Sequence, residues 1–288
     1  MSSMAMSPDP KVLKIQIGIE LRRLRENAGH TAAEAAEVLG GAVPKISKIE
    51  NGKQAATPEE VEKLANLYGT PAKRRKYLAN LAAQVPKRSR RRTMYRDAVP
   101  DWVQRFFALE SEATEMKIYE VELVTGLFQI EDYARATLLA WEPAADPRLV
   151  ESHVKTRMER QAVLARTDPA LDLHVVLSES ALHRVQGSQD VMARQLNHLL
   201  EVSELPNVRL QVLPFDANRI AVTSSAALMH LSDQQLSTVY LEDFLGATYL
   251  WEPEEYTRYS VIFERLSNAA LPVPKTRQLI GRVLKKYR

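Results

Sequence analysis

The sequence contains no cysteine, and only ten of its 288 residues are glycine. Without cysteine the chain has no disulfide, no thiolate metal ligand and no cysteine nucleophile. Aromatic residues make up 7% of the chain, and no apolar run reaches the roughly 18–20 residues that a membrane-spanning helix needs. The first ten residues lack the charged-then-apolar pattern of a secretory signal. We therefore expect a soluble cytoplasmic protein without a membrane partner.

The net charge of +3 is unevenly distributed along the chain. Residues 1–93 contain 18 basic and 9 acidic residues, a net charge of +9, whereas residues 94–288 contain 21 basic and 27 acidic residues, a net charge of −6. Basic surface attracts polyanions and supplies the non-specific part of nucleic-acid binding. The acidic excess of the second half argues against a second DNA-binding surface there. The two halves are therefore expected to have different partners.

Helical signals fill the first 85 residues. Thr31 and Glu34 form a capping-box pair, Pro44 suits the first turn of a helix, and Thr57 is a further N-terminal cap. Together with the apolar spacing, these signals predict helices over residues 11–28, 31–39, 44–50 and 57–69, and a fifth from residue 70. The first part of the chain is thus expected to be a disordered tail, residues 1–10, followed by an all-α five-helix domain, residues 11–85.

A basic linker over residues 86–93 is expected to separate this domain from a second one, residues 94–288, because nothing in the linker anchors it in a core. The basic runs at 73–76 and 88–92 either extend contacts with phosphates or are simply solvated. In the second domain we expect helices over 100–116, 131–141, 147–165, 189–203 and 253–271, and strands over 173–177, 208–213, 226–231 and 237–241. Helices mixed with at least four short strands favour an α+β domain with a small sheet.

Two short helices joined by a glycine turn can place the second helix in the major groove of DNA. Residues 21–69 resemble the phage-repressor type of helix-turn-helix, often called the XRE family, throughout their length. The matching residues are Leu21–Glu26, Thr31, Glu34, Ala36, Leu39, Gly40, Ile46–Lys53, Leu64-Ala65 and Tyr68-Gly69. The resemblance implies that the third helix binds double-stranded DNA.

By this resemblance, Val43, Pro44 and Lys48 occupy positions that face bases. Lys48 is the best candidate for a guanine contact, since its ammonium group can reach O6 and N7. Ser47 contacts a base or a phosphate, or is simply solvated, and the sequence does not separate these alternatives.

Phosphate contacts are implied for Lys45, Asn51 and Lys53. Both lysines alternatively give only sequence-independent charge, which is the reading that we favour for Lys53. Thr31 is expected to combine its capping role with a phosphate contact at the helix N-terminus, where backbone amides attract anions.

Arg25 and Glu50 occupy positions at which the family has an internal ion pair, and we interpret this pair as structural. The chain departs from the family at two places. Ala32 replaces a frequent glutamine and cannot form a side-chain hydrogen bond. Ala42 replaces the usual Ser or Thr cap of the third helix, at a cost of about 1 kcal/mol that Pro44 partly offsets. These departures bear on affinity and base preference.

The second half resembles the C-terminal domain of the actinobacterial WhiJ-like regulators, long labelled a domain of unknown function. The matching residues are Tyr119-Glu120, Gly126–Arg135, Arg157, Arg160-Gln161, Val176–Glu179, Ala181-Leu182, Arg184, Gln195-Leu196, Pro206–Val208, Gln211–Pro214 and Tyr240–Glu242. Genes of this group often lie beside one for a small partner protein, and some members are described as antitoxin-like. The resemblance therefore implies a domain that receives an effector or a protein partner.

Catalytic motifs are missing from the sequence. It contains no H-E-x-x-H, G-x-S-x-G or G-x-G-x-x-G motif and no phosphate-binding glycine loop, and its histidines lack metal-ligand spacing. Residues 178–180, Ser-Glu-Ser, suit a strand-to-helix cap better than a hydrolase site. We expect no catalysis, no cofactor and no bound metal.

The sequence therefore predicts a sequence-specific transcriptional regulator that is not an enzyme. Its second domain is expected to support a homodimer and to sense a ligand or a small protein encoded nearby. The alternative is an antitoxin-like protein that sequesters a small partner and autoregulates its own operon. A third reading, an enzyme with a DNA-targeting arm, is disfavoured by the missing motifs.

Overall fold

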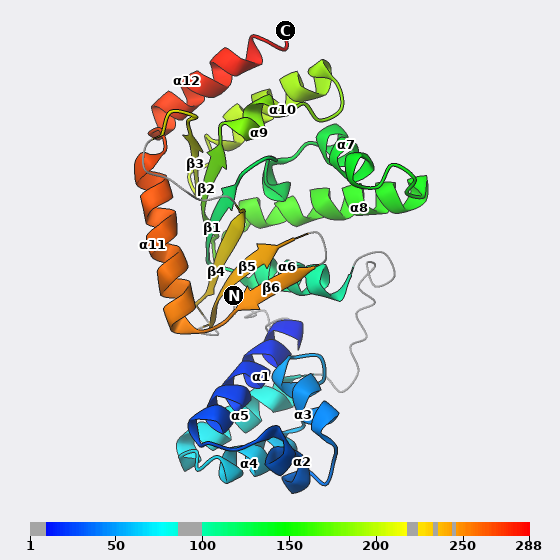
Figure 1. The fold of residues 1–288 in the computed structure, drawn as a ribbon, viewed down its shortest axis with the longest axis vertical. Helices are drawn as coiled ribbons and strands as arrows, with labels where there is room; N and C mark the ends of the chain where they lie inside the picture. The colour runs from blue at the N-terminus through cyan, green and yellow to red at the C-terminus, as the bar shows by residue number, and fades with distance from the viewer. Residues whose placement is uncertain (1–9, 86–99, 218–223, 233–235, 244–245) are drawn as a thin grey trace, which may run out of the picture. The chain divides into compact units, whose positions relative to one another are not determined.

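The computed structural model describes residues 10–85, 100–217, 224–232, 236–243 and 246–288 (Figure 1). The chain divides into two compact units, Met1–Thr93 and Met94–Arg288. The expected linker at 86–93 and residues 1–9 of the expected tail lie outside the described residues. Pro10, which we assigned to the tail, is instead the first residue of a helix.

The first unit has five helices over its described residues, as predicted. They are α1 (Pro10–Asn27), α2 (Ala32–Val38), α3 (Val43–Glu50), α4 (Pro58–Leu67) and α5 (Ala72–Gln84). Their apolar faces meet in one core, in which Leu13, Leu21, Ile46, Ile49 and Leu64 are at most 1% exposed. Burial of these side chains is the main force that holds α3 against the other helices.

A glycine allows α1 to lie unusually close to the end of α3. A Cβ atom on Gly18 would lie 2.3 Å from the carbonyl oxygen of Ile49 and 2.8 Å from that of Glu50. Real side chains essentially never approach backbone atoms so closely. The absence of a side chain at Gly18 therefore sets the distance between α1 and α3.

The second unit contains one mixed sheet of six strands over its described residues, which confirms the α+β prediction. The strands are β1 (Glu115–Glu120), β2 (Asp172–Ser178), β3 (Val208–Leu213), β4 (Ala226–Leu231), β5 (Leu236–Glu242) and β6 (Ala247–Leu250). Their order in the sheet is β3-β2-β1-β4-β5-β6. The pairs β1–β2 and β2–β3 are parallel, and the other three pairs are antiparallel.

Helices cover both faces of this sheet (Figure 1). They are α6 (Asp101–Glu112), α7 (Glu131–Trp141), α8 (Pro147–Arg160), α9 (Ser180–His183), α10 (Gln189–Val202), α11 (Pro253–Ala269) and α12 (Val273–Leu284), with 3₁₀ turns η1 (Gly126–Phe128) and η2 (Gln161–Ala165). Phe263 and Leu266 of α11 pack against Tyr119 and Val176 on one face. On the other face, the Phe106 ring of α6 lies 4.5 Å from the Tyr240 ring of β5.

The structure corrects several sequence expectations in the second unit. The helix expected over 100–116 is wrong at its end, since α6 stops at Glu112 and Met116 belongs to β1. In β1, Met116 and Ile118 are buried, whereas Glu115 and Lys117 pair with each other at 2.7 Å. The helix expected over 147–165 ends at Arg160, and the remaining residues form the 3₁₀ turn η2. Elements β1, β6 and α12 were not predicted. The helix α9 begins at Ser180, where the strand-to-helix cap was expected, and the Ser180 amide donates to the Ser178 hydroxyl.

Replacement of Gly18 by alanine tests the close contact of α1 with α3. We expect Gly18→Ala to destabilise the first unit by about 1–3 kcal/mol of overpacking, which exceeds the roughly 1 kcal/mol of helix propensity that alanine gains. The matched control is Gly281→Ala in α12, where an added Cβ meets no atom within 4 Å and should stabilise its helix. Urea unfolding of the full-length chain measures both effects. A stabilising Gly18→Ala would contradict the described packing.

Candidate nucleic-acid interface

The N-terminus of α2 is closed by a reciprocal pair of hydrogen bonds. The Thr31 hydroxyl accepts from the backbone amide of Glu34 at 3.2 Å, and the Glu34 carboxylate accepts from the backbone amide of Thr31 at 2.7 Å. Hydrogen bonds from the Thr31 backbone and side chain lower the pKa of Glu34, so this carboxylate stays ionised. Thr31 is exposed, but a phosphate at this helix end would compete with Glu34.

Between α2 and α3 the chain makes a tight turn. Gly40 has a φ of +59°, a left-handed conformation that favours glycine, and it ends α2. No side chain caps α3, because Ala42 has no hydrogen-bonding group, and Pro44 sits in the first turn. The turn thus directs α3 out of the line of α2, as a helix-turn-helix requires.

One face of α3 is buried and the opposite face is open. Ile46 and Ile49 are each 1% exposed and belong to the core. The open face carries Val43, which is 45% exposed, Pro44 and Lys48, the residues that we expected to meet bases. It also carries the exposed Ser47, for which the sequence left a base contact, a phosphate contact and simple solvation open. Among the described residues, none forms an ion pair or a side-chain hydrogen bond with the Lys48 ammonium.

The Lys45 side chain forms an ion pair with Glu60 of α4. Its Nζ lies 2.5 Å from Oε1 of Glu60, and both side chains are partly shielded from solvent. Partial burial opposes ionisation of Glu60, but hydrogen bonds from Lys45 and from the Thr57 backbone outweigh it and lower the pKa of that carboxyl. A phosphate contact by Lys45 would therefore replace this ion pair. The sequence predicted the cap at Thr57 that begins α4, but it did not predict the pairing of Glu60 with Lys45.

The end of α3 presents two further expected residues. The Asn51 side-chain amide donates to the Ser47 carbonyl at 2.7 Å and so closes the last turn of the helix. Lys53 is exposed, and its backbone amide donates to the Lys48 carbonyl at 2.8 Å. This hydrogen bond turns the chain sharply after α3 and keeps Lys53 near the helix end.

Arg25 and Glu50 form a bidentate ion pair between the last turn of α1 and the end of α3. Arg25 Nε lies 2.6 Å from Glu50 Oε1, and Nη2 lies 3.0 Å from Oε2. The third nitrogen, Nη1, donates to the His30 carbonyl at 3.0 Å. The side chains of Arg25 and Glu50 are only 13% and 7% exposed. One guanidinium thus fixes α1, α3 and the loop that precedes α2 relative to one another.

These features define a two-domain protein with a helix-turn-helix unit, the class of domain found in DNA-binding regulators. Residues 16–78 match a family described as a helix-turn-helix domain. Residues 103–282, more than half of the chain, match the family described as a domain of unknown function (DUF5753), and the chain belongs to this family. The architecture inferred from the two resemblances is confirmed. Searches of curated proteins and of solved structures find no match.

Two absences concern the described ranges of the chain. No helix there combines the length and the apolar character needed to cross a membrane. The same ranges hold no group of three or more His, Asp or Glu side chains arranged to bind a metal ion.

Loss of the Arg25 guanidinium tests its structural role. We expect Arg25→Ala to lower the free energy of unfolding of the first unit by about 1.5–3 kcal/mol, because Glu50 is left charged and shielded from water. Arg25→Lys should recover only part of this loss, since lysine lacks the planar fork.

The matched control is Arg22→Ala on the same helix. Arg22 pairs with Glu26 at the surface, where both side chains are about half exposed, and such pairs contribute less than about 1 kcal/mol. Chemical denaturation measures all three variants. Equal losses for Arg25→Ala and Arg22→Ala would contradict the role assigned to Arg25.

Proposed function

We propose that the protein is a sequence-specific transcriptional regulator that reads double-stranded DNA through α3. The observation that carries the proposal is the open face of α3, where Val43, Pro44, Ser47 and Lys48 project from a helix whose other face is fixed in the core. In this proposal the exposed Lys48 contacts a guanine edge and the exposed Lys53 contacts phosphate. Asn51 and Thr31 support the helix ends rather than the readout.

A single recognition helix contacts few base pairs, so useful affinity requires two copies bound to adjacent half-sites. We therefore propose a homodimer in the cytoplasm, with the second unit supporting dimerisation and receiving a signal. The function does not require catalysis. The lack of catalytic motifs in the sequence supports a non-enzymatic role, without a cofactor.

Retention of fragmented genomic DNA by the purified protein, followed by sequencing, tests this function. We expect enrichment of a few sites with two related half-sites. Lys48→Ala should change base preference at one position in each half-site, a discrimination worth about 1–3 kcal/mol. Lys53→Ala should weaken binding to all sequences alike and reduce its salt dependence.

The matched control is Lys63→Ala, which removes an exposed cation of α4 instead of one on or beside α3. It should leave the enriched sites unchanged. Uniform weak retention that disappears with salt, in the wild type as in every variant, would contradict sequence-specific reading.

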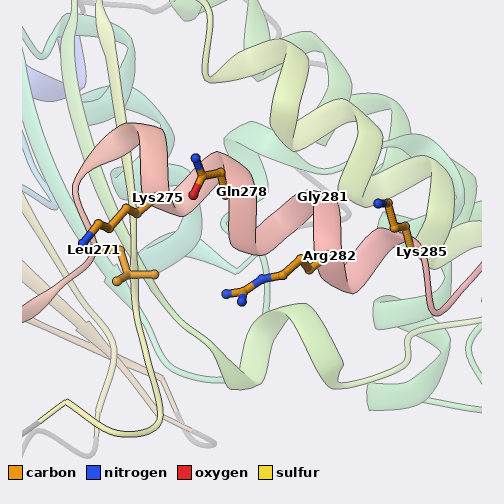
Figure 2. Close-up of a pocket in the computed structure, with 6 residues that line it drawn as sticks. All are labelled: Leu271, Lys275, Gln278, Gly281, Arg282 and Lys285. Carbon is orange, nitrogen blue, oxygen red and sulfur yellow. The ribbon is translucent and has the colours of Figure 1, made fainter.

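A second candidate function, an antitoxin-like protein that sequesters a small partner, is favoured by a basic hollow along α12 (Figure 2). The hollow is lined by Leu271, Lys275, Gln278, Gly281, Arg282 and Lys285. Lys275, Arg282 and Lys285 form no ion pair with any described residue, whereas the neighbouring Arg277 pairs with Glu204 at 2.5 Å. Three cations without an ion-pair partner among the described residues would suit an acidic segment of a partner protein.

Charge reversal in this basic hollow tests the second candidate. If a small protein co-purifies with the chain, Lys275→Glu combined with Arg282→Glu should abolish its retention. Arg258→Glu, which reverses an exposed charge of α11 outside the hollow, should preserve it. Retention by the double variant would exclude this surface as the docking site.

A further inference from the structure

Lys45 lies on a different side of α3 from the open face. Successive residues of an α-helix are about 100° apart around its axis, so Lys45 and Ser47 point to nearly opposite sides of α3. Ile49, one turn after Lys45, is 1% exposed and belongs to the core. The stem of Lys45 runs beside the turn between α2 and α3, where a Cβ atom on Gly41 would lie 3.4 Å from its Cδ atom. The ammonium group of Lys45 therefore lies next to Glu60 of α4.

Both carboxylate oxygens of Glu60 are engaged. Oε1 lies 2.5 Å from Lys45 Nζ, and Oε2 accepts a hydrogen bond from the backbone amide of Thr57 at 2.9 Å. The Thr57 hydroxyl in turn accepts from the backbone amide of Glu60 at 3.2 Å, which completes the capping box of α4. Because the cap already fixes the Glu60 side chain, little further conformational entropy is lost when it pairs with Lys45.

The other two lysines that were expected to contact DNA have no such partner. Lys48 and Lys53 are exposed and form no ion pair with any described residue. The side chains of Lys45 and Glu60, in contrast, are 33% and 21% exposed, so salt and water screen their attraction less than that of a fully exposed pair. Partial burial opposes ionisation of Glu60, but the hydrogen bonds from Lys45 and Thr57 lower its pKa, so the carboxylate is charged at neutral pH.

We propose that Glu60 restrains Lys45 and thereby lowers the affinity of the protein for DNA of every sequence. The ion pair persists in the complex, so the charge of Lys45 is neutralised by the carboxylate and not by a phosphate. Glu60 itself does not touch DNA. It is a positioning residue that acts through Lys45, and the inference rests on the proposed function, in which α3 binds DNA.

One ammonium group has to choose between two anions. A phosphate contact would gain the release of about one counterion from the DNA. It would also remove Lys45 from Glu60 and leave a partly shielded carboxylate without its partner, which costs free energy. That carboxylate would in addition be repelled by the phosphates next to it. The carboxylate that is already fixed in place is therefore the better partner for Lys45.

This restraint changes the strength of binding and not the base preference. Contacts from lysine to phosphate attract DNA of any sequence, whereas contacts to base edges carry the sequence information. Residues 1–93 have a net charge of +9, so an additional unpaired lysine would add to an attraction that is already strong. Glu60 removes one cation from this attraction and leaves Val43, Pro44 and Lys48 unchanged. The phosphate contact that the XRE resemblance implies for Lys45 is then not made by the wild type.

Binding of the full-length chain to two labelled duplexes tests the proposal by fluorescence anisotropy. One duplex carries a retained DNA site, and the other has the same bases in scrambled order. We expect Glu60→Gln to bind both duplexes about three- to tenfold more tightly than the wild type, because Lys45 becomes free to contact a phosphate. The logarithm of its affinity should also fall more steeply with the logarithm of the salt concentration, by about 0.9 for one additional phosphate. Glutamine can maintain the cap with Thr57.

The matched control is Glu59→Gln, which removes the same charge from the neighbouring, exposed position of α4. It should change the affinity for either duplex by less than about twofold, because salt screens an exposed charge. Lys45→Ala should bind like the wild type, and Lys45→Ala combined with Glu60→Gln should show no gain in affinity. A gain that survives in this double variant would mean that Glu60 acts without Lys45, and it would overturn the proposal.

Urea unfolding of each variant shows whether it is folded. Unchanged or weaker binding by a folded Glu60→Gln would also overturn the proposal. If Glu60→Gln does not fold, Lys45→Ala decides the question by itself. A loss of affinity together with a flatter salt dependence in Lys45→Ala would show that Lys45 of the wild type contacts a phosphate, which contradicts the restraint. Binding like that of the wild type would support it.

Failure of the proposed function gives a different result from failure of this inference. Equal binding of the wild type to both duplexes would reject sequence-specific reading, while the effect of Glu60→Gln could still be measured on either duplex. A wild type that prefers the retained site, with a Glu60→Gln variant that binds no more tightly, would leave the proposed function intact and reject the inference. Absence of binding to both duplexes would reject both.

Discussion

The reading face of the first unit depends on one interaction, the bidentate ion pair between Arg25 and Glu50. It joins the last turn of α1 to the last turn of α3 and also holds the loop before α2 through the His30 carbonyl. Gly18 complements it by allowing the two helices to meet at backbone distance. The ion pair and the close contact at Gly18 together fix the position of α3 against α1 in the absence of DNA. The proposed reading of DNA depends on this preorganisation, because side chains on a fixed helix lose little conformational entropy on binding.

Local signals in the sequence were sufficient for the first unit, because its helices are short and their ends are marked by particular residues. Thr31 and Thr57 both form the capping boxes that their spacing with glutamates predicts. The pairing of Lys45 with Glu60 was not foreseen, since these residues lie fifteen positions apart on different helices. The apolar periodicity of a single helix does not predict a contact between two helices. Three lysines were expected to contact DNA. Lys48 and Lys53 form no ion pair with a described residue, whereas Lys45 is paired with Glu60.

The strand β1 and the register of the sheet in the second unit were not predicted from the sequence. The first two residues of β1, Glu115 and Met116, were assigned to the end of a helix, and the rest of the strand was not predicted. In the structure Met116 and Ile118 are buried and alternate with the polar Glu115 and Lys117. Without β1, the sheet register could not be derived. That register is set by long-range pairing rather than by local propensity.

The absence of cysteine allows a direct test of the central claim, that the open face of α3 lies in the major groove. Ser47→Cys introduces a single thiol on that face, and Lys63→Cys introduces one on α4 as a control. Each is labelled with a photoactivatable cross-linker and irradiated on an enriched DNA site. The account predicts cross-links from position 47 to bases at fixed positions in each half-site, and none to bases from position 63. Base cross-links from position 63, or none from position 47 while binding persists, would contradict it.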